Sequence, residues 1–313
     1  MTISAKIIAD SVANGIRITT MELEYPRFIH AECKTHRILS LDDENYEVVL
    51  KQSADFMEDP MLSRNASSSR AIPVKKFIER IQENPAMPIH WGKNQPGMQA
   101  DEELDSWGGM GHWQGAIDCI VDIAFDMAND GYHKQVVNRL LDTFAHIKVI
   151  VTATEWDNFF KLRLHPSAQP EMQELARCMK EAMDNSVPVK LMYGEWHLPY
   201  VEYDEFECAD GSIDMEEAIK CSVARCARVS YLNHDKSNPD IEMDIALANT
   251  LLLDGHMSPF EHQATPMLEP IDTGIAISNI DIYNMQEGVT HVTTKGELWS
   301  GNFRGWVQYR QTL

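Results

Sequence analysis

Hydrophobic and polar residues along the chain form patterns that predict both strands and helices. Residues 16–24 alternate between the two kinds and are rich in β-branched side chains, which is typical of a half-buried strand. Residues 114–129 instead place apolar side chains on one helical stripe, and Gly131 follows as a stop signal. Further helical patterns follow Pro166 and Ser167 through residue 183 and cover residues 241–252. The chain therefore mixes both kinds of element.

Two other apolar segments complete this picture. Residues 146–154 (HIKVIVTAT) are β-branched and short, so they fit either a buried strand or the start of a helix. Residues 274–282 alternate like a strand. Helices and strands intermix without a linker rich in proline, glycine or serine, which favours one α/β or α+β domain spanning residues 1–313.

Two stretches differ from the rest of the predicted domain in charge or in periodicity. Residues 41–62 hold seven carboxylates and one lysine, and Tyr46, Val49, Leu50 and Phe56 are spaced for a short amphipathic helix. We interpret this stretch as an acidic surface insertion. Residues 89–107 mix tryptophan, glycine and proline without periodicity and predict a long structured loop.

Composition narrows the class of protein. The 313 residues are 44% hydrophobic and 24% charged, as in folded soluble domains. A net charge of −21 opposes binding to nucleic acid or to an anionic membrane, and no run of 18 apolar residues predicts a membrane span. We therefore expect a cytoplasmic protein. An anionic small substrate remains possible where a few arginines form a local pocket.

The sequence contains neither of two common nucleotide-binding motifs and no paired cysteines. Neither a G-x-G-x-x-G fingerprint nor a phosphate-binding loop of the G-x-x-x-x-G-K-[ST] type occurs, so a nucleotide cofactor would not be bound in Rossmann fashion. The six cysteines form no C-x-x-C pair and are predicted to be reduced, mostly buried thiols. They are Cys33, Cys119, Cys178, Cys208, Cys221 and Cys226.

Four clusters carry candidate chemistry. Residues 35–37 and 64–70 together offer guanidinium and hydroxyl groups that suit a phosphate monoester, although a solvated serine-rich turn has the same composition. Arg163 follows a bulky apolar run and needs an anionic or polar partner, either a structural carboxylate or a ligand. Residues 255–262 hold two histidines and a glutamate, but Pro259 interrupts any helix that would align them around a metal ion. Residues 228–230 indicate no chemistry on their own.

Taken together, these clusters resemble the flavin-dependent thymidylate synthases (the ThyX family). Residues 36–40 and 64–70 are similar to the signature R-H-R-x-x-S-x-N-E-x-S-x-R-Y, which the acidic segment 41–63 would split. Residues 152–173 are similar to N-x-R-x-x-x-x-F-x-x-L-R-x-x-x-x-A-Q-x-E-I. Residues 227–230 and 255–262 are similar to A-R-V-S and G-H-x-[ST]-P-F-E-H, which precede the first signature in the family. This order implies a circular permutation.

The resemblance implies a fold and a reaction. The fold would be a mixed α/β core with a mostly antiparallel sheet and long helices. The family uses FAD and NAD(P)H to transfer a one-carbon unit from methylenetetrahydrofolate to C5 of dUMP and to reduce it, giving dTMP. No thiol nucleophile is required, and the sites lie between the subunits of a homotetramer.

The resemblance also implies roles for individual residues. Arg163 would hold the pyrimidine and withdraw charge from it, which is electrostatic catalysis by a fixed cation. Ser68, with Arg70, would face the nucleotide phosphate. The complete implied set comprises catalytic Arg163 and Ser68, substrate-binding Ser68, Ser69, Arg70, Glu32, Arg139 and Arg163, and flavin-binding His36, Arg37, Asn65, Asn158, Ser230, His256, Ser258 and Glu261.

The chain departs from the family pattern at several positions. Glu32 replaces a glutamine, and a carboxylate beside the base can only accept a hydrogen bond, for example from an amino group. Asn138 replaces the arginine of E-x-x-R, with Arg139 one place later, and Ser40 and Ser63 compete for one position. Other family residues are replaced by Thr35, Ala66, Ala71, Thr152 and Thr154.

These departures keep other functions open. The same one-carbon unit added to dUMP or dCMP, with or without reduction, would serve DNA modification. A non-catalytic nucleotide-binding homologue would have kept the fold after losing flavin contacts. A metal-dependent hydrolase using His256 and His262 is the remaining alternative.

Overall fold

The centre of the structure is a five-stranded sheet with strand order β4-β5-β2-β1-β6. The computed structural model describes residues 3–35, 48–50, 63–96, 100, 102–230, 240–268, 286–293 and 296–313. All neighbouring strands are antiparallel except β1 and β6, so the predicted mixed fold with a mostly antiparallel sheet is confirmed. The strands are β1 (Ser4–Ala13), β2 (Ile16–Pro26), β4 (Ser63–Ala66), β5 (His146–Ala153) and β6 (Val189–Lys190).

A tight hairpin starts the sheet. Asn14 and Gly15 have φ of 50° and 75°, the left-handed backbone that a two-residue hairpin turn requires, and Ala13 pairs with Ile16 across it. The strand predicted at residues 16–24 is confirmed as β2. The ambiguous β-branched run is a strand, β5, because it pairs along its whole length with β2.

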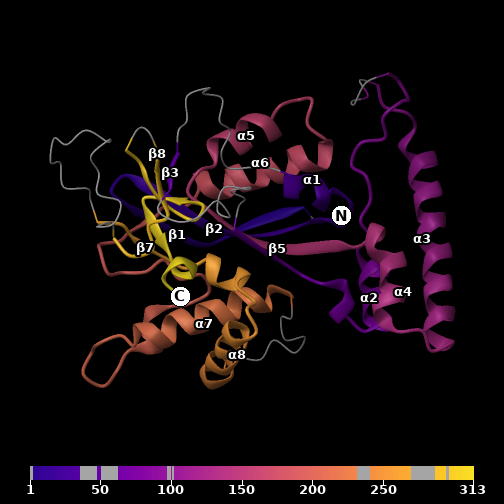
Figure 1. Cartoon of the computed structure of the whole chain (residues 1–313). Coiled ribbons are helices and arrows are strands. Elements are labelled where there is room, and N and C mark those ends of the chain that lie inside the picture. The colour runs from indigo at the N-terminus through magenta and orange to yellow at the C-terminus, as the bar shows by residue number, and fades with distance from the viewer. Residues whose placement is uncertain are drawn as a thin grey trace.

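Helices α1 (His30–Thr35), α5 (Asp157–Arg163) and α6 (Pro170–Asp184) cover one face of the sheet (Figure 1). Alternate residues of β2 and β5, such as Leu23 and Val149, pack there against Phe159 and Met172. Helix α6 begins at Pro170 and not directly after Pro166. Residues 165–168 form a turn first, closed by a hydrogen bond from the amide of Ala168 to the carbonyl of His165.

The opposite face carries α7 (Met215–Ala227) and α8 (Ile241–Leu253), as Figure 1 shows. Ile150 packs there against Cys226 and Val229. The predicted helix at 241–252 is confirmed as α8, which Asp240 caps and which ends before Gly255 in the left-handed region. The fully buried carboxylate of Asp244 joins α8 to α7.

Three more helices pack together beyond the sheet: α2 (Val74–Glu83), α3 (Ser106–Asn129) and α4 (Lys134–Leu141). Ile117 and Val121 of α3 form their apolar contact with Phe77 and Val137. The predicted helix at 114–129 is confirmed and starts earlier, at a cap provided by Asp105. The long α3 lies at one edge of the molecule (Figure 1).

A second sheet has the order β10-β9-β8-β3, and β7 pairs separately with β11. The short helix predicted around residues 46–56 is wrong for residues 48–50, which form β3 because they pair with β8. The strand predicted at 274–282 lies outside the described residues. The bounds are β3 (Val48–Leu50), β7 (Ala264–Pro266), β8 (His291–Thr293), β9 (Leu298–Ser300), β10 (Phe303–Arg304) and β11 (Trp306–Gln308).

Other sequence predictions concern the loop and the thiols. The loop predicted at 89–107 is irregular up to Asp105 in its described part, with a single bridge between Gly92 and Glu103. All cysteines are free, but Cys119 and Cys208 are exposed, so the prediction of mostly buried thiols is too broad. No helix within the described part of the chain is long and apolar enough to span a membrane.

Candidate functional site

The predicted site residues gather around the edge strand β4 and divide between its two faces. Arg64 is paired with Val151, and Asn65 with Ile150, so the alternation of the strand sends their side chains to opposite sides of the sheet. Arg64 faces the side covered by α1 and α5, which we call the α5 face. Asn65 faces the side covered by α7, which we call the α7 face.

On the α5 face, Arg163 is paired with Glu32. The Nη1 of Arg163, the last residue of α5, donates to Oε1 of Glu32 in α1 at 2.5 Å. The two side chains are 19% and 31% exposed, so both border solvent. The Nε of Arg163 is buried and has no hydrogen-bond partner among the described residues. The guanidinium therefore retains a donor for a ligand.

A buried thiol lies beside this pair. Burial raises the pKa of Cys33, while Tyr25 as a hydrogen-bond partner and the charges of Arg64 and Arg163 oppose that rise. The neutral thiol is therefore favoured near pH 7. Sequence reasoning did not place Tyr25, Cys33 or Arg64 among the site residues. Arg64 opens the quoted serine-rich segment, whereas Tyr25 and Cys33 carry no local signal.

The serine-rich segment after β4 is fixed by backbone contacts. The amide of Ser67 donates to the carbonyl of Lys148 at 2.8 Å, and the amide of Lys148 donates to Ser67 Oγ at 3.1 Å. Asn138, fully buried, donates to the carbonyl of Ser69 at 2.7 Å. The Oγ of Ser69 is itself buried without a partner among the described residues. Ser68 is half-buried and Arg70 is exposed.

Positive charge gathers beneath the serine-rich segment. Arg27, which sequence reasoning missed, lies with its Nη1 3.5 Å from the carbonyl oxygen of Ser67 and its Nε 3.1 Å from Asp142. Burial lowers the pKa of Arg27, and Asp142 opposes that change. Arg139 is exposed and lies 3.6 Å from the same carboxylate. Asn138, at the family's arginine position, is a structural residue here.

On the α7 face, two turns pack against β4. They are the single-turn helices η6 (Arg228–Ser230) and η7 (Ser258–Glu261). The Nδ2 of Asn65 is buried there and has no partner among the described residues. Two segments far apart from β4 in the chain therefore meet it in space.

The carboxylate of Glu261 is paired with an arginine. It forms an ion pair with Arg310 of η10 (Tyr309–Thr312), and Arg64 contributes a second positive charge. Burial raises the pKa of Glu261, and Arg310 and Arg64 oppose that rise. Sequence reasoning missed Arg310 because no motif surrounds it.

The remaining predicted residues are placed as follows. Asn158 is half-buried in the first turn of α5, while His256 and Ser258 are exposed. His36 and Arg37, and the side chain of Ser230, lie outside the described part. The two histidines of residues 255–262 do not converge, because His262 is fully buried. Among the described residues, no group of three or more His, Cys, Asp or Glu side chains is placed to hold a metal ion.

A buried polar row crosses the sheet on the α7 face. His197 Nε2 and Thr20 Oγ1 are 2.8 Å apart, Thr20 and Thr152 are linked at 2.7 Å, and Thr152 Oγ1 lies 2.8 Å from His262 Nδ1. Burial lowers the pKa of both histidines to about 3, so both are neutral near pH 7. Thr152, which replaces a family asparagine, is thus part of the core.

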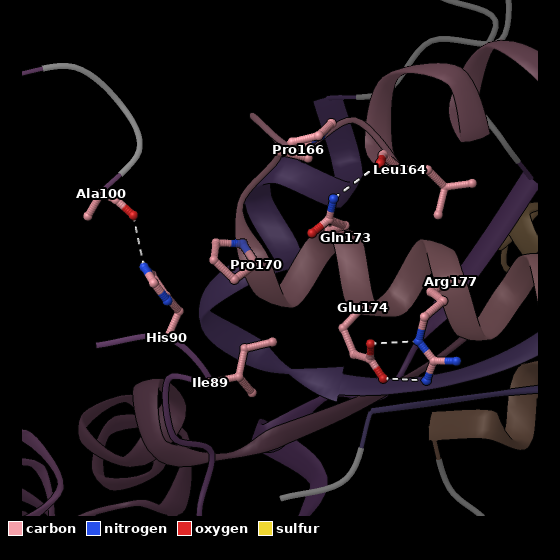
Figure 2. Close-up of a pocket in the computed structure, with 10 residues that line it drawn as sticks. Ile89, His90, Ala100, Leu164, Pro166, Pro170, Gln173, Glu174 and Arg177 are labelled. Carbon is pink, nitrogen blue, oxygen red and sulfur yellow. Dashed lines mark hydrogen bonds and ion pairs between the residues drawn. The ribbon is translucent and has the colours of Figure 1, made fainter. Parts of the chain in front are cut away.

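A separate pocket lies between the loop around His90 and the start of α6 (Figure 2). It measures about 530 Å³ and is lined by Gln173, Glu174 and Arg177 among others. Gln173 is turned towards the carbonyl of Leu164, to which its Nε2 donates at 3.1 Å. None of the predicted site residues lines this pocket.

Comparison with known families settles the relationship. A family model described as thymidylate synthase complementing protein matches residues 10–189, which is more than half of the chain. The chain belongs to this family. Its members are the flavin-dependent thymidylate synthases, so a flavin-dependent thymidylate synthase activity is the family assignment of this protein. No curated protein matches the sequence.

The family match covers the α5 face and the serine-rich segment. Glu32, residues 64–70 and Arg163 all lie within it. The turns η6 and η7 lie beyond residue 189, outside the match, although they pack against its β4.

Proposed function

We propose that the protein transfers a one-carbon unit from methylenetetrahydrofolate to C5 of a pyrimidine deoxynucleoside monophosphate and reduces it, with FAD as cofactor and NAD(P)H as reductant. The family's reference reaction converts dUMP to dTMP. One observation carries the proposal. Three predicted ligand contacts have a buried polar atom without a hydrogen-bond partner among the described residues: Arg163 Nε, Ser69 Oγ and Asn65 Nδ2. Buried polar atoms are nearly always satisfied, so bound ligands are the expected partners.

The nucleotide is expected at the α5 face and the serine-rich segment. Arg163, held by Glu32, would bind the pyrimidine and stabilise negative charge as C5 becomes nucleophilic. Ser68, Ser69 and Arg70 would bind the phosphate through hydroxyl and guanidinium donors. Arg27 and Arg139 add positive charge near this segment, which a protein with a net charge of −21 needs to attract an anion.

The flavin is expected on the α7 face. The residues there fit it, because Asn65 offers an unsatisfied donor and Glu261 an acceptor that Arg310 keeps in place. Ser258, His256 and Ser230 would complete the contacts on this face. Asn158 lies in α5 and would reach the flavin from the α5 face, and the predicted flavin contacts His36 and Arg37 lie outside the described residues. FAD supplies the hydride chemistry when bound, and the chain's own residues bind and orient the reactants.

Two features of the fold support the remaining parts of the proposal. The turns η6 and η7 reach β4 although they follow it in the chain, as a circular permutation of one domain spanning 1–313 requires. The α5 and α7 faces lie on opposite sides of one strand, which is consistent with a proposed site that takes groups from more than one chain. The exposed Trp107, Ile123 and Phe125 of α3 offer apolar surface for the proposed homotetramer.

The test is a product assay on the purified protein. FAD, NADPH and methylenetetrahydrofolate are supplied with dUMP and, in a separate reaction, with dCMP; the nucleotide mass is measured and bound flavin is recorded by absorbance. A methyl gain on the nucleotide, undiminished by a chelator, supports the proposal and excludes the hydrolase. Protein that remains colourless after FAD reconstitution and gives no product would support the non-catalytic homologue. The soluble co-substrates favour a cytoplasmic location.

A further inference from the structure

The direct contact between Glu32 and Arg163 bears on which pyrimidine the site accepts. The two side chains form an ion pair at 2.5 Å. The carboxylate of Glu32 can only accept hydrogen bonds, and the guanidinium of Arg163 beside it can only donate them. Both side chains border solvent, and Arg163 keeps a buried, unsatisfied Nε. A base that reaches Arg163 therefore meets the carboxylate of Glu32 as its immediate neighbour.

The two candidate pyrimidines present different edges to such a pair. Cytosine presents the amino group at C4 as a donor, followed by N3 and O2 as acceptors. Glu32 can accept from the amino group while the guanidinium of Arg163 donates to N3 and O2, which satisfies the whole edge. Pairing of a carboxylate with the cytosine amino group is an established mode of base recognition.

Uracil matches this pair less well. Its edge reads acceptor, donor, acceptor, because O4 and O2 flank the N3 proton. If Glu32 accepts from N3 and Arg163 donates to one carbonyl, the other carbonyl is left without a donor from this pair. A glutamine at position 32 would remove this conflict, because an amide both donates and accepts.

Resting on the proposed function, we infer that Glu32 makes this site selective for the cytosine nucleotide dCMP over dUMP. The methyl-group chemistry of the site is unchanged, and the selectivity arises in binding. One correctly paired base edge is worth about a 10- to 100-fold difference in affinity. Glu32 is thus the specificity-determining residue, and Arg163 is the group that it positions.

Nucleotide binding tests this inference independently of turnover. The FAD-loaded protein is titrated calorimetrically with dCMP and with dUMP, without folate or reductant. Wild type is expected to bind dCMP at least 10-fold more tightly, and Glu32→Gln to reverse the preference. Glu174→Gln is the matched control, because Glu174 pairs with a different arginine, Arg177, at 2.7 Å. It should leave the ratio unchanged.

The other outcomes separate the two proposals. Tighter binding of dUMP by wild type, together with its conversion to dTMP, would overturn the inference and leave the proposed function standing. A dCMP preference that persists in Glu32→Gln would remove Glu32 from the explanation. Absence of binding by both nucleotides, in protein that is folded by circular dichroism and loaded with FAD, would overturn the inference and the proposed function together.

Discussion

Ser63 and Gln308 are joined by a hydrogen bond of 3.0 Å although 245 positions separate them in the chain. Ser63 also donates to Asn302 at 3.0 Å, and Gln308 donates in turn to the carbonyl of Glu261. The first residue of β4 is therefore fixed to the C-terminal hairpin and to the turn that holds the proposed flavin contact. Ser63, one of two residues competing for a motif position, is a structural residue in this fold.

This contact sets the boundary for a test of residues 41–62 as a surface insertion. Removal of residues 41–62 retains Ser63 but deletes the edge strand β3 of the second sheet; it is expected to leave a folded protein that binds FAD. Removal of 41–63 should cost about 1–3 kcal/mol more in the free energy of unfolding, because buried Asn302 and Gln308 lose a partner. Urea unfolding of the two deletions measures the difference. Insoluble expression of the shorter deletion would show that the segment is structural.

Arg163→Ala is expected to lower kcat at least about 100-fold, because a preorganised charge at the reacting base is lost. Folding should change little, since Glu32 is 31% exposed and its carboxylate can be hydrated when Arg163 is removed. Steady-state kinetics and thermal unfolding separate the two effects. Arg177→Ala removes a comparable guanidinium from its pair with Glu174 and is the control. Wild-type turnover in Arg163→Ala would refute the assigned role.

Cys33→Ala is expected to retain most of the turnover. The thiol lies beside Arg163, but burial raises its pKa and keeps it protonated, so it is poorly suited to attack the base. A stability loss of about 1 kcal/mol is expected from the smaller side chain. Activity of the variant, and of wild type treated with iodoacetamide, measures this. Loss of turnover without loss of folding would assign the thiol a covalent role.

Asp244→Asn should be strongly destabilising. The fully buried carboxylate lies 3.1 Å from Arg225 and 2.5 Å from Arg228, and its loss leaves two guanidiniums underpaired. A decrease of about 3–5 kcal/mol in the free energy of unfolding is expected. Glu216→Gln, which breaks an exposed pair with Lys220, should cost at most about 0.5 kcal/mol. Equal effects of the two changes would contradict the structure.

The two buried histidines predict an acid sensitivity. Their pKa of about 3 lies below the value near 6.5 of an unfolded histidine, so the unfolded chain binds more protons between these limits. The stabilisation is present above pH 6.5 and is lost as the pH falls towards 3, by about 1.4 kcal/mol per pH unit for each histidine. His262→Asn should reduce the slope of the unfolding free energy against pH by the contribution of one histidine. His133→Asn, at an exposed site, is the control. An unchanged slope in His262→Asn would contradict the assignment.

Sequence patterns predicted the elements whose burial is periodic and local. The stripe that includes Ile117 and Val121 defined α3, and the alternation around Met21 defined β2, because each pattern reflects one buried face. The start of α6 was misplaced, since both Pro166 and Pro170 can begin a helix and only tertiary contacts choose. Strand β3 was missed because its identity depends on pairing with distant β8.

In the candidate site, too, local motifs could be predicted from the sequence and long-range contacts could not. Motif resemblance named Arg163, Ser69 and Asn65 as ligand contacts, and each has a buried polar atom without a hydrogen-bond partner among the described residues. The sequence could not predict contacts between distant segments, such as the ion pairs of Arg163 with Glu32 and of Arg310 with Glu261. A lone arginine offers no indication of its partner, because the partner is selected by the fold and not by the spacing of residues.

Strand β4 sends Arg64 and Asn65 to opposite faces of the sheet. A shift of one residue in its pairing with β5 would exchange every side chain between the two faces. The nucleotide and flavin contacts would then fail together, whatever the stability of the protein. A single residue added within β4 is therefore expected to abolish the proposed activity. The register of β4 therefore determines which side chains face each of the two proposed ligands.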